Sequence, residues 1–171
     1  MWQYSGNERP PFAESPAAGQ ESVWDYPRPP ALHPDPREIV VRAGATIVAE
    51  SRTTYRVLET ASPPTFYIPP DDIRMDMLID GNGTSYCEWK GAARYWSLKL
   101  QDRVLENIAW DYESPNPGFA AIAGYLSFYP GRIECLVDGE RVRPQPGGFY
   151  GGWLTDDIAG PVKGPPGTSH W

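Results

Sequence analysis

The stretch Tyr86-Cys87-Glu88-Trp89-Lys90-Gly91-Ala92-Ala93-Arg94-Tyr95-Trp96 is the centre of this sequence. It brings together one of the two cysteines and one of the three lysines, among four large aromatic residues. Alternate side chains of a strand share a face, so Ser85, Cys87 and Trp89 are expected to point the same way. Glycine inside a strand pattern often marks a bend, which predicts a turn or bulge at Lys90-Gly91. A strand that presents Cys87 and then bends is suited to the mouth of a cleft.

The sequence around this stretch predicts a mainly β protein. Segments rich in β-branched and aromatic residues alternate with turn signals, which is typical of antiparallel strands joined by hairpins. The expected strands are 38–42, 46–50, 55–60, 66–68, 73–79, 84–89, 93–100, 103–110, 126–129, 132–137 and 140–143. We expect a hairpin turn at Asp80-Gly81-Asn82-Gly83, because Asp-Gly and Asn-Gly supply the positive φ angles of such turns. One short helix is expected over 117–124, with proline in its first turn and glycine at its end.

The prolines and glycines cluster toward the two ends of the chain. Twenty prolines and seventeen glycines predict a Pro-rich arm over 1–37 and a Gly/Pro/aromatic extension over 144–171, around a domain at 38–143. We expect both arms to pack through their aromatic residues, either on this chain or on a second copy. The first twenty residues are expected to be the exception, and to be mobile.

Composition excludes several partners. The net charge of −7 and the pI of about 4.8 argue against a nucleic-acid backbone and against an anionic membrane surface. No apolar run approaches the roughly 20 residues of a membrane helix. The first residues lack the basic and apolar regions of a signal peptide, so we expect a soluble, cytoplasmic protein.

The cysteines and histidines limit the chemistry. Cys87 and Cys135 do not form a disulfide scaffold, and both histidines, His33 and His170, fall in the predicted arms. A structural zinc site needs about four such ligands, and a Ser-His-Asp or Cys-His pair needs a histidine in the domain. We therefore predict no metal site and no cofactor.

Cys87 and Lys90 are the candidate catalytic residues. A nearby cation lowers the pKa of a thiol and makes it nucleophilic, and Lys90 is the cation that the sequence places closest. In the alternative interpretation Cys87 is a small buried hydrophobe and Lys90 a surface charge. Cys135 alternates with Ile133 and Val137 on one strand face, which is typical of core.

Two further pairs of charged residues have both a functional and a structural interpretation. Arg56 and Glu59 flank a strand, where an ion pair is the structural alternative to ligand binding. Asp71 and Asp72 could hold a hard cation, although surface turns also attract aspartate. There is no glycine-rich phosphate loop and no dinucleotide fingerprint.

Five segments together resemble a widespread bacterial and fungal family of domains of unknown function, sometimes labelled nucleotidyltransferase-like. They are Arg56-Val57-Leu58-Glu59-Thr60, Tyr67-Ile68-Pro69, Cys87-Glu88-Trp89-Lys90-Gly91, Ala109-Trp110-Asp111-Tyr112 and Phe128-Tyr129-Pro130. The resemblance covers about 38–143 and implies a compact β-tent type fold. The zinc cysteines of other β-tent proteins are absent here. The chain also departs from the family at Glu88, where proline is usual, and at Gly131, where aspartate is usual.

Three hypotheses for function follow. The first is a small-molecule-binding β domain with a cleft around catalytic Cys87 and Lys90. Its predicted ligand-binding residues are Arg56, Glu59, Tyr67, Trp89, Tyr95 and Trp110. The second is a non-catalytic module that forms a homodimer, or docks on a partner, through its aromatic, Pro-rich arms. The third is a nucleotide-handling protein, as the family label suggests.

Overall fold

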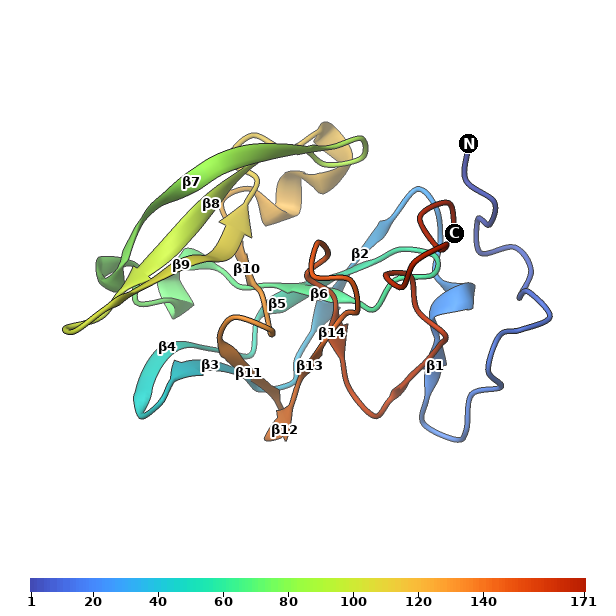
Figure 1. Cartoon of the computed structure of the whole chain (residues 1–171), viewed down its shortest axis with the longest axis horizontal. Helices are drawn as coiled ribbons and strands as arrows, with labels where there is room; N and C mark the ends of the chain where they lie inside the picture. The colour runs from blue at the N-terminus through green and yellow to red at the C-terminus, as the bar shows by residue number, and fades with distance from the viewer.

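Three antiparallel sheets make up most of the regular structure in the computed structural model, which describes residues 1–171 (Figure 1). The first sheet has the order β10-β9-β8-β7 and contains β7 (Leu78–Cys87), β8 (Gly91–Lys99), β9 (Val104–Asp111) and β10 (Leu126–Phe128). The second has the order β12-β11-β3-β4 and contains β3 (Ile39–Ala43), β4 (Thr46–Ser51), β11 (Glu134–Val137) and β12 (Glu140–Arg141). The third has the order β2-β5-β6 and contains β2 (Ala31–Asp35), β5 (Thr54–Leu58) and β6 (Thr65–Tyr67). The prediction of a mainly β fold is confirmed.

The shorter elements lie mostly in the two ends of the chain. β1 (Glu21–Ser22) pairs in parallel with β15 (Ile158–Ala159), and β13 (Arg143–Pro144) pairs antiparallel with β14 (Trp153–Leu154). The helical turns are η1 (Val23–Asp25), η2 (Pro70–Asp72), η3 (Met75–Met77) and η4 (Pro117–Ile122). All four are 3₁₀ turns. The predicted helix is therefore present as η4, and η1, η2 and η3 were not predicted.

The main core lies between the first two sheets. Its fully buried side chains include Ile39 and Val41 from β3, Leu98 from β8, and Phe128 from β10. Cys135 on β11 is also fully buried in it, and burial raises the pKa of this thiol. The interpretation of Cys135 as a core residue thus agrees with the structure.

One predicted hairpin is wrong. Asp80-Gly81-Asn82-Gly83 does not reverse the chain; β7 runs through it, and only its register against β8 shifts between Asp80 and Thr84. Asn107 explains the difference. Its side chain accepts a hydrogen bond from Asn82 N (2.8 Å) and donates one to Asn82 O (2.9 Å). An amide side chain thus satisfies the backbone where the ladder is irregular, so the chain does not need to turn.

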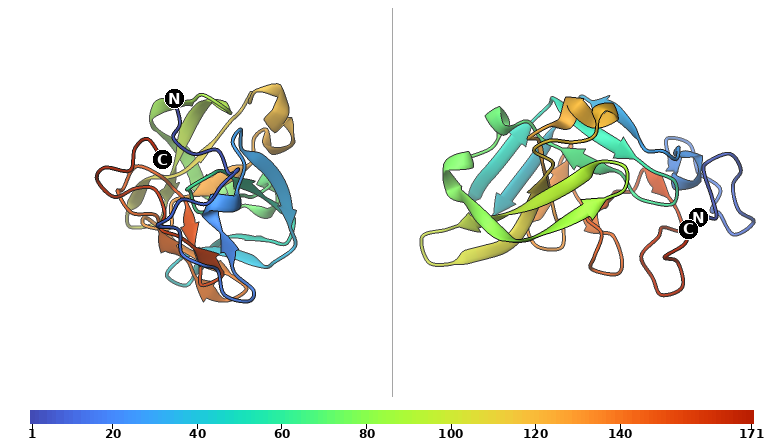
Figure 2. Two further views of the ribbon diagram at one scale, coloured as in Figure 1. Left: turned by 90° about the vertical axis from the view of Figure 1, so that its right-hand side faces the viewer. Right: turned by 90° about the horizontal axis from the view of Figure 1, so that it is seen from above.

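The two arms pack on each other and on the third sheet. Gln3 N donates to His170 O at 3.1 Å, and the two ends of the chain lie close together in Figures 1 and 2. Trp24 is fully buried, with the rings of Tyr4, Phe12 and Trp171 5.2, 5.4 and 5.3 Å away. The expectation that the first twenty residues are an exception to this packing is therefore wrong, because Tyr4 and Phe12 contribute to this aromatic cluster.

β2 lies inside the segment 1–37 and is an edge strand beside β5. Pro34 fits there, in register with Tyr55, because an edge strand has one side without a ladder partner and tolerates a missing N–H. Regular sheet structure thus begins before residue 38.

Candidate functional site

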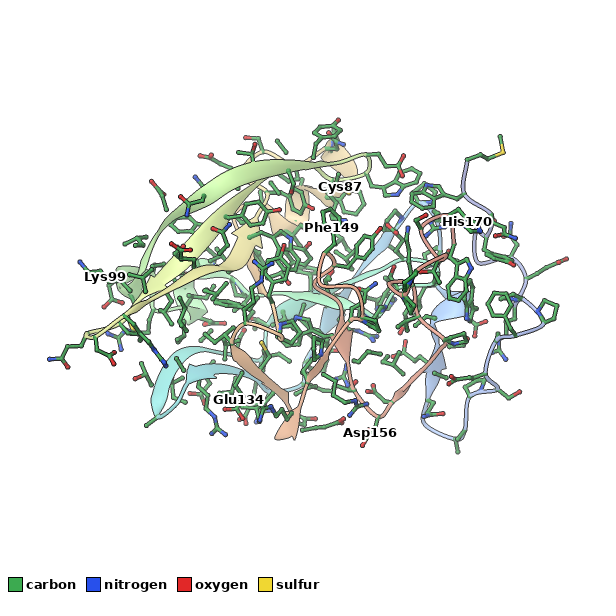
Figure 3. The ribbon with its side chains drawn as sticks, viewed as in Figure 1. Cys87, Lys99, Glu134, Phe149, Asp156 and His170 are labelled. Atoms are coloured by element: carbon green, nitrogen blue, oxygen red, sulfur yellow. The ribbon has the colours of Figure 1, made fainter.

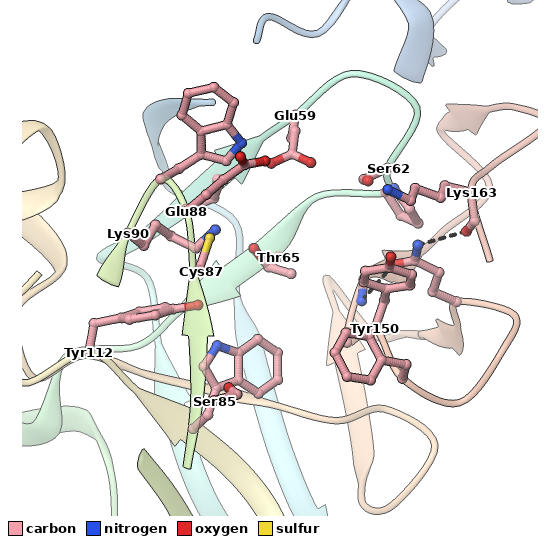
Figure 4. A pocket seen from close by; sticks show the side chains of 18 of the residues that line it. Glu59, Ser62, Thr65, Ser85, Cys87, Glu88, Lys90, Tyr112, Tyr150 and Lys163 are labelled. Carbon is pink, nitrogen blue, oxygen red and sulfur yellow. Dashed lines mark hydrogen bonds between the residues drawn. The ribbon is translucent and has the colours of Figure 1, made fainter. Parts of the chain in front are cut away.

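A cavity of about 300 Å³ lies between the turn that joins β7 to β8 and the C-terminal extension (Figure 4). Its lining comes from the β7–β8 hairpin, from the other strands and their loops, and from both ends of the chain. The end of β7 and the turn that follows it give 85–90, the sheets and neighbouring loops give Val57, Glu59, Ser62, Pro63, Thr65, Tyr67, Tyr95, Trp110, Tyr112 and Tyr129, and the ends give Trp2, Gln145, 149–152 and Lys163.

The turn between β7 and β8 positions Cys87 and Lys90. Cys87 pairs with Gly91 in the ladder, and Gly91 has a φ of 105°, a conformation that favours glycine. Asn116 fixes the turn, since its side chain donates to Trp89 O (2.8 Å) and its backbone N–H donates to Lys90 O (3.0 Å). The chain therefore reverses at the predicted Lys90-Gly91 position, as a full hairpin turn.

Lys90 is a buried cation without a carboxylate partner. It is 9% exposed, and no Asp or Glu oxygen lies within 4.0 Å of its Nζ, which instead lies 5.6 Å from the centre of the Tyr112 ring. Burial by itself lowers the pKa of Lys90, but the neighbouring Tyr67, Cys87 and Glu59 outweigh burial and raise it. Lys90 is therefore an ammonium at neutral pH. Figure 4 shows it beside the half-buried thiol of Cys87.

Two phenols lie close to this pair. Tyr67 is 1% exposed and its hydroxyl accepts a hydrogen bond from Trp110 Nε1 at 3.2 Å. Burial raises the pKa of both Tyr67 and Tyr112, so both hydroxyls keep their protons. A ligand at this end of the cavity would thus find an ammonium, a thiol and two neutral hydroxyl groups.

A second buried lysine, Lys163, lines the other side of the cavity (Figure 4). It is 2% exposed, and no carboxylate oxygen lies within 4.0 Å of its Nζ. The Nζ lies 4.1 Å from the centre of the Trp2 ring and 5.3 Å from that of Tyr150. Burial and the charge of Arg28 lower the pKa of Lys163, and Glu59 and Glu88 oppose them only in part.

The two carboxylates that line the cavity are engaged by neighbours. Glu88 accepts a hydrogen bond from Trp2 Nε1 at 2.8 Å, and Glu59 pairs with Arg28 at 3.4 Å. Arg28 Cζ also lies 4.2 Å from the centre of the Trp2 ring. Trp2 therefore contacts both Glu88 of the β7–β8 turn and two cations of the arms, Arg28 and Lys163.

The structure brings seven of the eight predicted site residues together. The residues that line the cavity are Glu59, Tyr67, Cys87, Trp89, Lys90, Tyr95 and Trp110.

Arg56 is the exception, and its placement in the cleft is corrected. Its side chain points to the N-terminal arm, where Nη1 lies 2.8 Å from Glu21 and Nε lies 3.1 Å from Asp35. Side chains alternate across a strand, so Arg56 on β5 faces away from its neighbour Val57, which lines the cavity.

The ion pairs of Asp35 predict a dependence of stability on acid. Burial opposes the charge of Asp35, but hydrogen bonds from Arg37 and the charges of Arg37 and Arg56 outweigh burial and lower the pKa of Asp35 below 3.8. Its stabilising effect is therefore present above pH 3.8 and is lost as the pH falls through the lower folded value. We expect Asp35→Asn to be less stable than the wild type at pH 7 and to lose less stability between pH 5 and pH 2. Urea unfolding at each pH measures both effects, and Asp102→Asn in the exposed β8–β9 turn is the control. If the wild type and Asp35→Asn lost equal stability in acid, the ion pairs of Asp35 would not be the cause of the acid sensitivity.

Sequence reasoning missed the contribution of the chain ends to the cavity. Trp2, Phe149, Tyr150 and Lys163 all fall in segments that we assigned to the arms. Their aromatic content predicted that these segments pack, but no local signal indicates where a tail residue will lie.

Other site types find little support in the structure. No group of three or more His, Cys, Asp or Glu side chains is arranged to hold a metal ion. Asp72 instead accepts hydrogen bonds from Ser51 (2.6 Å) and Thr53 (3.1 Å). None of the helical segments has the length and apolar character needed to cross a membrane.

The chain matches a known protein family. No curated protein matches the chain. A protein family described as a domain of unknown function (DUF427), which carries a nucleotidyltransferase-like label, matches residues 31–139. This range includes Cys87 and Lys90 but neither Trp2 nor Lys163. Since the match spans more than half of the sequence, the chain belongs to this family of domains of unknown function.

Proposed function

We propose that the cavity binds a small organic anion with an apolar body and presents it to Cys87. The observation that carries the proposal is the Lys90 ammonium, which is buried in an aromatic cavity without a carboxylate partner. Burial removes the hydration of a charge, so an unpaired buried ammonium is costly. A carboxylate or similar group of a ligand would supply the missing counter-ion.

The walls of the cavity define the rest of the ligand. Trp89, Tyr95 and Trp110 offer aromatic faces for an apolar or aromatic body. A volume of about 300 Å³ lies at the lower end of the range of about 300–1,000 Å³ for ligand pockets, which favours a small molecule.

Cys87 is the proposed nucleophile of this site. Lys90 lies beside Cys87 and would hold the anionic group of the ligand there, so the sulfur is placed to attack an electrophilic carbon of the bound molecule. The hydroxyl groups of Tyr67 and Tyr112 are available as hydrogen-bond donors to a developing oxyanion.

Paired alkylating reagents test this proposal. Iodoacetate carries a carboxylate and iodoacetamide does not, so their rates at Cys87 compare an anion with its neutral analogue. We expect the iodoacetate-to-iodoacetamide rate ratio at Cys87 to exceed that of free cysteine. Lys90→Met should lower the ratio about 10- to 100-fold, because a hydrogen bond to a charged group contributes about 1.5–3 kcal/mol. Lys90→Arg should largely retain it, and mass spectrometry of the peptides separates Cys87 from buried Cys135.

Protection experiments test the apolar body. Indole-3-carboxylate should slow the alkylation of Cys87, and indole-3-carboxamide should not. A wild-type rate ratio no higher than that of free cysteine would contradict anion binding, and no labelling of the folded protein would contradict the role of Cys87.

The other two hypotheses have less support. The aromatic residues that favour a dimerisation module are Trp24, Tyr26, Trp153 and Trp171. The first three are buried within this one chain, and Trp171 is half-buried against Trp24 and Phe12 of the same chain. Nucleotide handling rests on the family label alone, and ATP with magnesium as a further protecting agent in the same experiment tests it.

A further inference from the structure

We propose that Lys163 is a second reactive group of this cavity, an amine that condenses with a small oxo acid or aldehyde acid to form an imine. This inference rests on the proposed function, because Lys90 would hold the carboxylate of the same molecule. It assigns a role to a residue outside the range of the family match. It also narrows the ligand from any small organic anion to one with a carbonyl carbon.

The backbone of Lys163 is fixed on both sides, which holds its side chain in the cavity. Lys163 N donates to Ala61 O at 2.7 Å, and Lys163 O accepts a hydrogen bond from Gln145 Nε2 at 2.7 Å. Gln145 is itself 4% exposed, and its Oε1 accepts a hydrogen bond from Gly152 N at 3.2 Å. The lysine therefore extends from a rigid part of the C-terminal extension.

The surroundings of the Lys163 Nζ favour a neutral amine more than those of Lys90 do. It is buried and no carboxylate pairs with it, although the rings of Trp2 and Tyr150 that flank it attract an ammonium. Arg28 lies near the same Trp2 ring, so a second cation acts on the ammonium form. Burial and a neighbouring cation are the two conditions that activate lysine amines toward carbonyl compounds, and both lower the pKa of Lys163.

Lys90 and Lys163 therefore suit different tasks. The groups around Lys90 outweigh its burial and raise its pKa, whereas burial and Arg28 outweigh Glu59 and Glu88 and lower the pKa of Lys163. They line the same cavity from different sides (Figure 4). A molecule with a carboxylate at one end and a carbonyl group at the other would match both.

Formation of the imine needs only the amine, the carbonyl compound and protons exchanged with solvent, and it requires no oxidant or reductant. The Nζ lone pair of the neutral amine attacks the carbonyl carbon and forms a C–N bond. The carbonyl oxygen takes up two protons, one of them from the ammonium of the adduct and one from solvent, and leaves as water. The resulting iminium returns one proton to solvent when it becomes the neutral imine.

Reductive trapping tests the proposal, and the composition of the chain makes the readout simple. The intact protein is treated with 4-formylbenzoate and cyanoborohydride, and labelled peptides are identified by mass. The chain has three lysines; Lys99 is exposed at the far end of β8 and serves as an internal reference (Figure 3). We expect Lys163 to be labelled at least tenfold faster than Lys99.

Two variants separate the roles of the lysines. Lys163→Arg keeps a positive charge but removes the amine, so it should lose the label in the cavity and still bind benzoate in calorimetry. Lys90→Met should slow the labelling of Lys163 by 4-formylbenzoate about tenfold and leave labelling by neutral benzaldehyde unchanged.

The outcomes distinguish this inference from the proposed function. If benzoate binds but Lys163 is labelled no faster than Lys99, Lys163 is only a counter-ion and the imine is excluded. If benzoate does not bind, Cys87 shows no preference for iodoacetate and Lys163 is not labelled, anion binding in the cavity is wrong as well.

Discussion

Replacing Trp153 with alanine should lower the free energy of unfolding by about 3–5 kcal/mol, the usual cost of removing a buried tryptophan. Trp153 is fully buried and its ring stacks on Phe66, with centroids 4.9 Å apart. Its Nε1 donates to Phe128 O at 2.9 Å, and its backbone N–H donates to Pro64 O at 2.8 Å. The substitution therefore leaves a cavity and an unpaired buried carbonyl group. Urea unfolding at neutral pH measures the loss.

Phe149→Ala is the matched control, because this aromatic residue lies four positions earlier in the same extension and is 72% exposed. Its effect should stay within about 0.5 kcal/mol. A loss below 1 kcal/mol for Trp153→Ala would contradict the assignment of the C-terminal extension to the main core.

Much of the fold could be predicted from the sequence, because most of its hairpins are encoded locally. The hairpins β3–β4, β8–β9 and β11–β12 were predicted from short turns between strand-forming runs, and the structure contains all three. The segment Asp80–Gly83 has equally strong turn residues, but Asn107, more than twenty positions away, pairs with its backbone. A non-local side chain thus overrides a local preference there.

In the candidate site, too, some residues are positioned by local sequence and others by contacts between distant segments. Cys87, Trp89 and Lys90 belong to one turn, so their proximity follows from a short stretch of sequence. Trp2 and Lys163 come from opposite ends of the chain, and their positions depend on how the arms pack. Arg56 was misplaced because the sequence shows that strand faces alternate, but it does not show which face of β5 meets the cavity.

A second large effect is expected for Trp24→Ala, which should also lower the free energy of unfolding by about 3–5 kcal/mol. Trp24 is fully buried and contacts rings from both ends of the chain, namely Tyr4 and Phe12 from the N-terminal end and Trp171 from the C-terminal end. Arg28 joins the same two ends, because its Nη1 donates to Tyr4 O (2.8 Å) and to Trp171 O (3.0 Å). Phe12→Ala, at a ring that is 45% exposed in the same cluster, should cost clearly less.

The Trp24 substitution should also change the cavity, since the arms that it holds carry Trp2 and Lys163. In protein that is still folded, iodoacetamide should alkylate Cys87 faster in Trp24→Ala than in Phe12→Ala, because Trp2 no longer covers the β7–β8 turn through its hydrogen bond to Glu88. Equal rates in the two variants would mean that the arms do not control access to Cys87. The unfolding of the wild-type protein tests whether the arms pack within one chain. If they do, the midpoint of unfolding should be independent of protein concentration. Arms exchanged between two copies would instead make the midpoint rise with concentration.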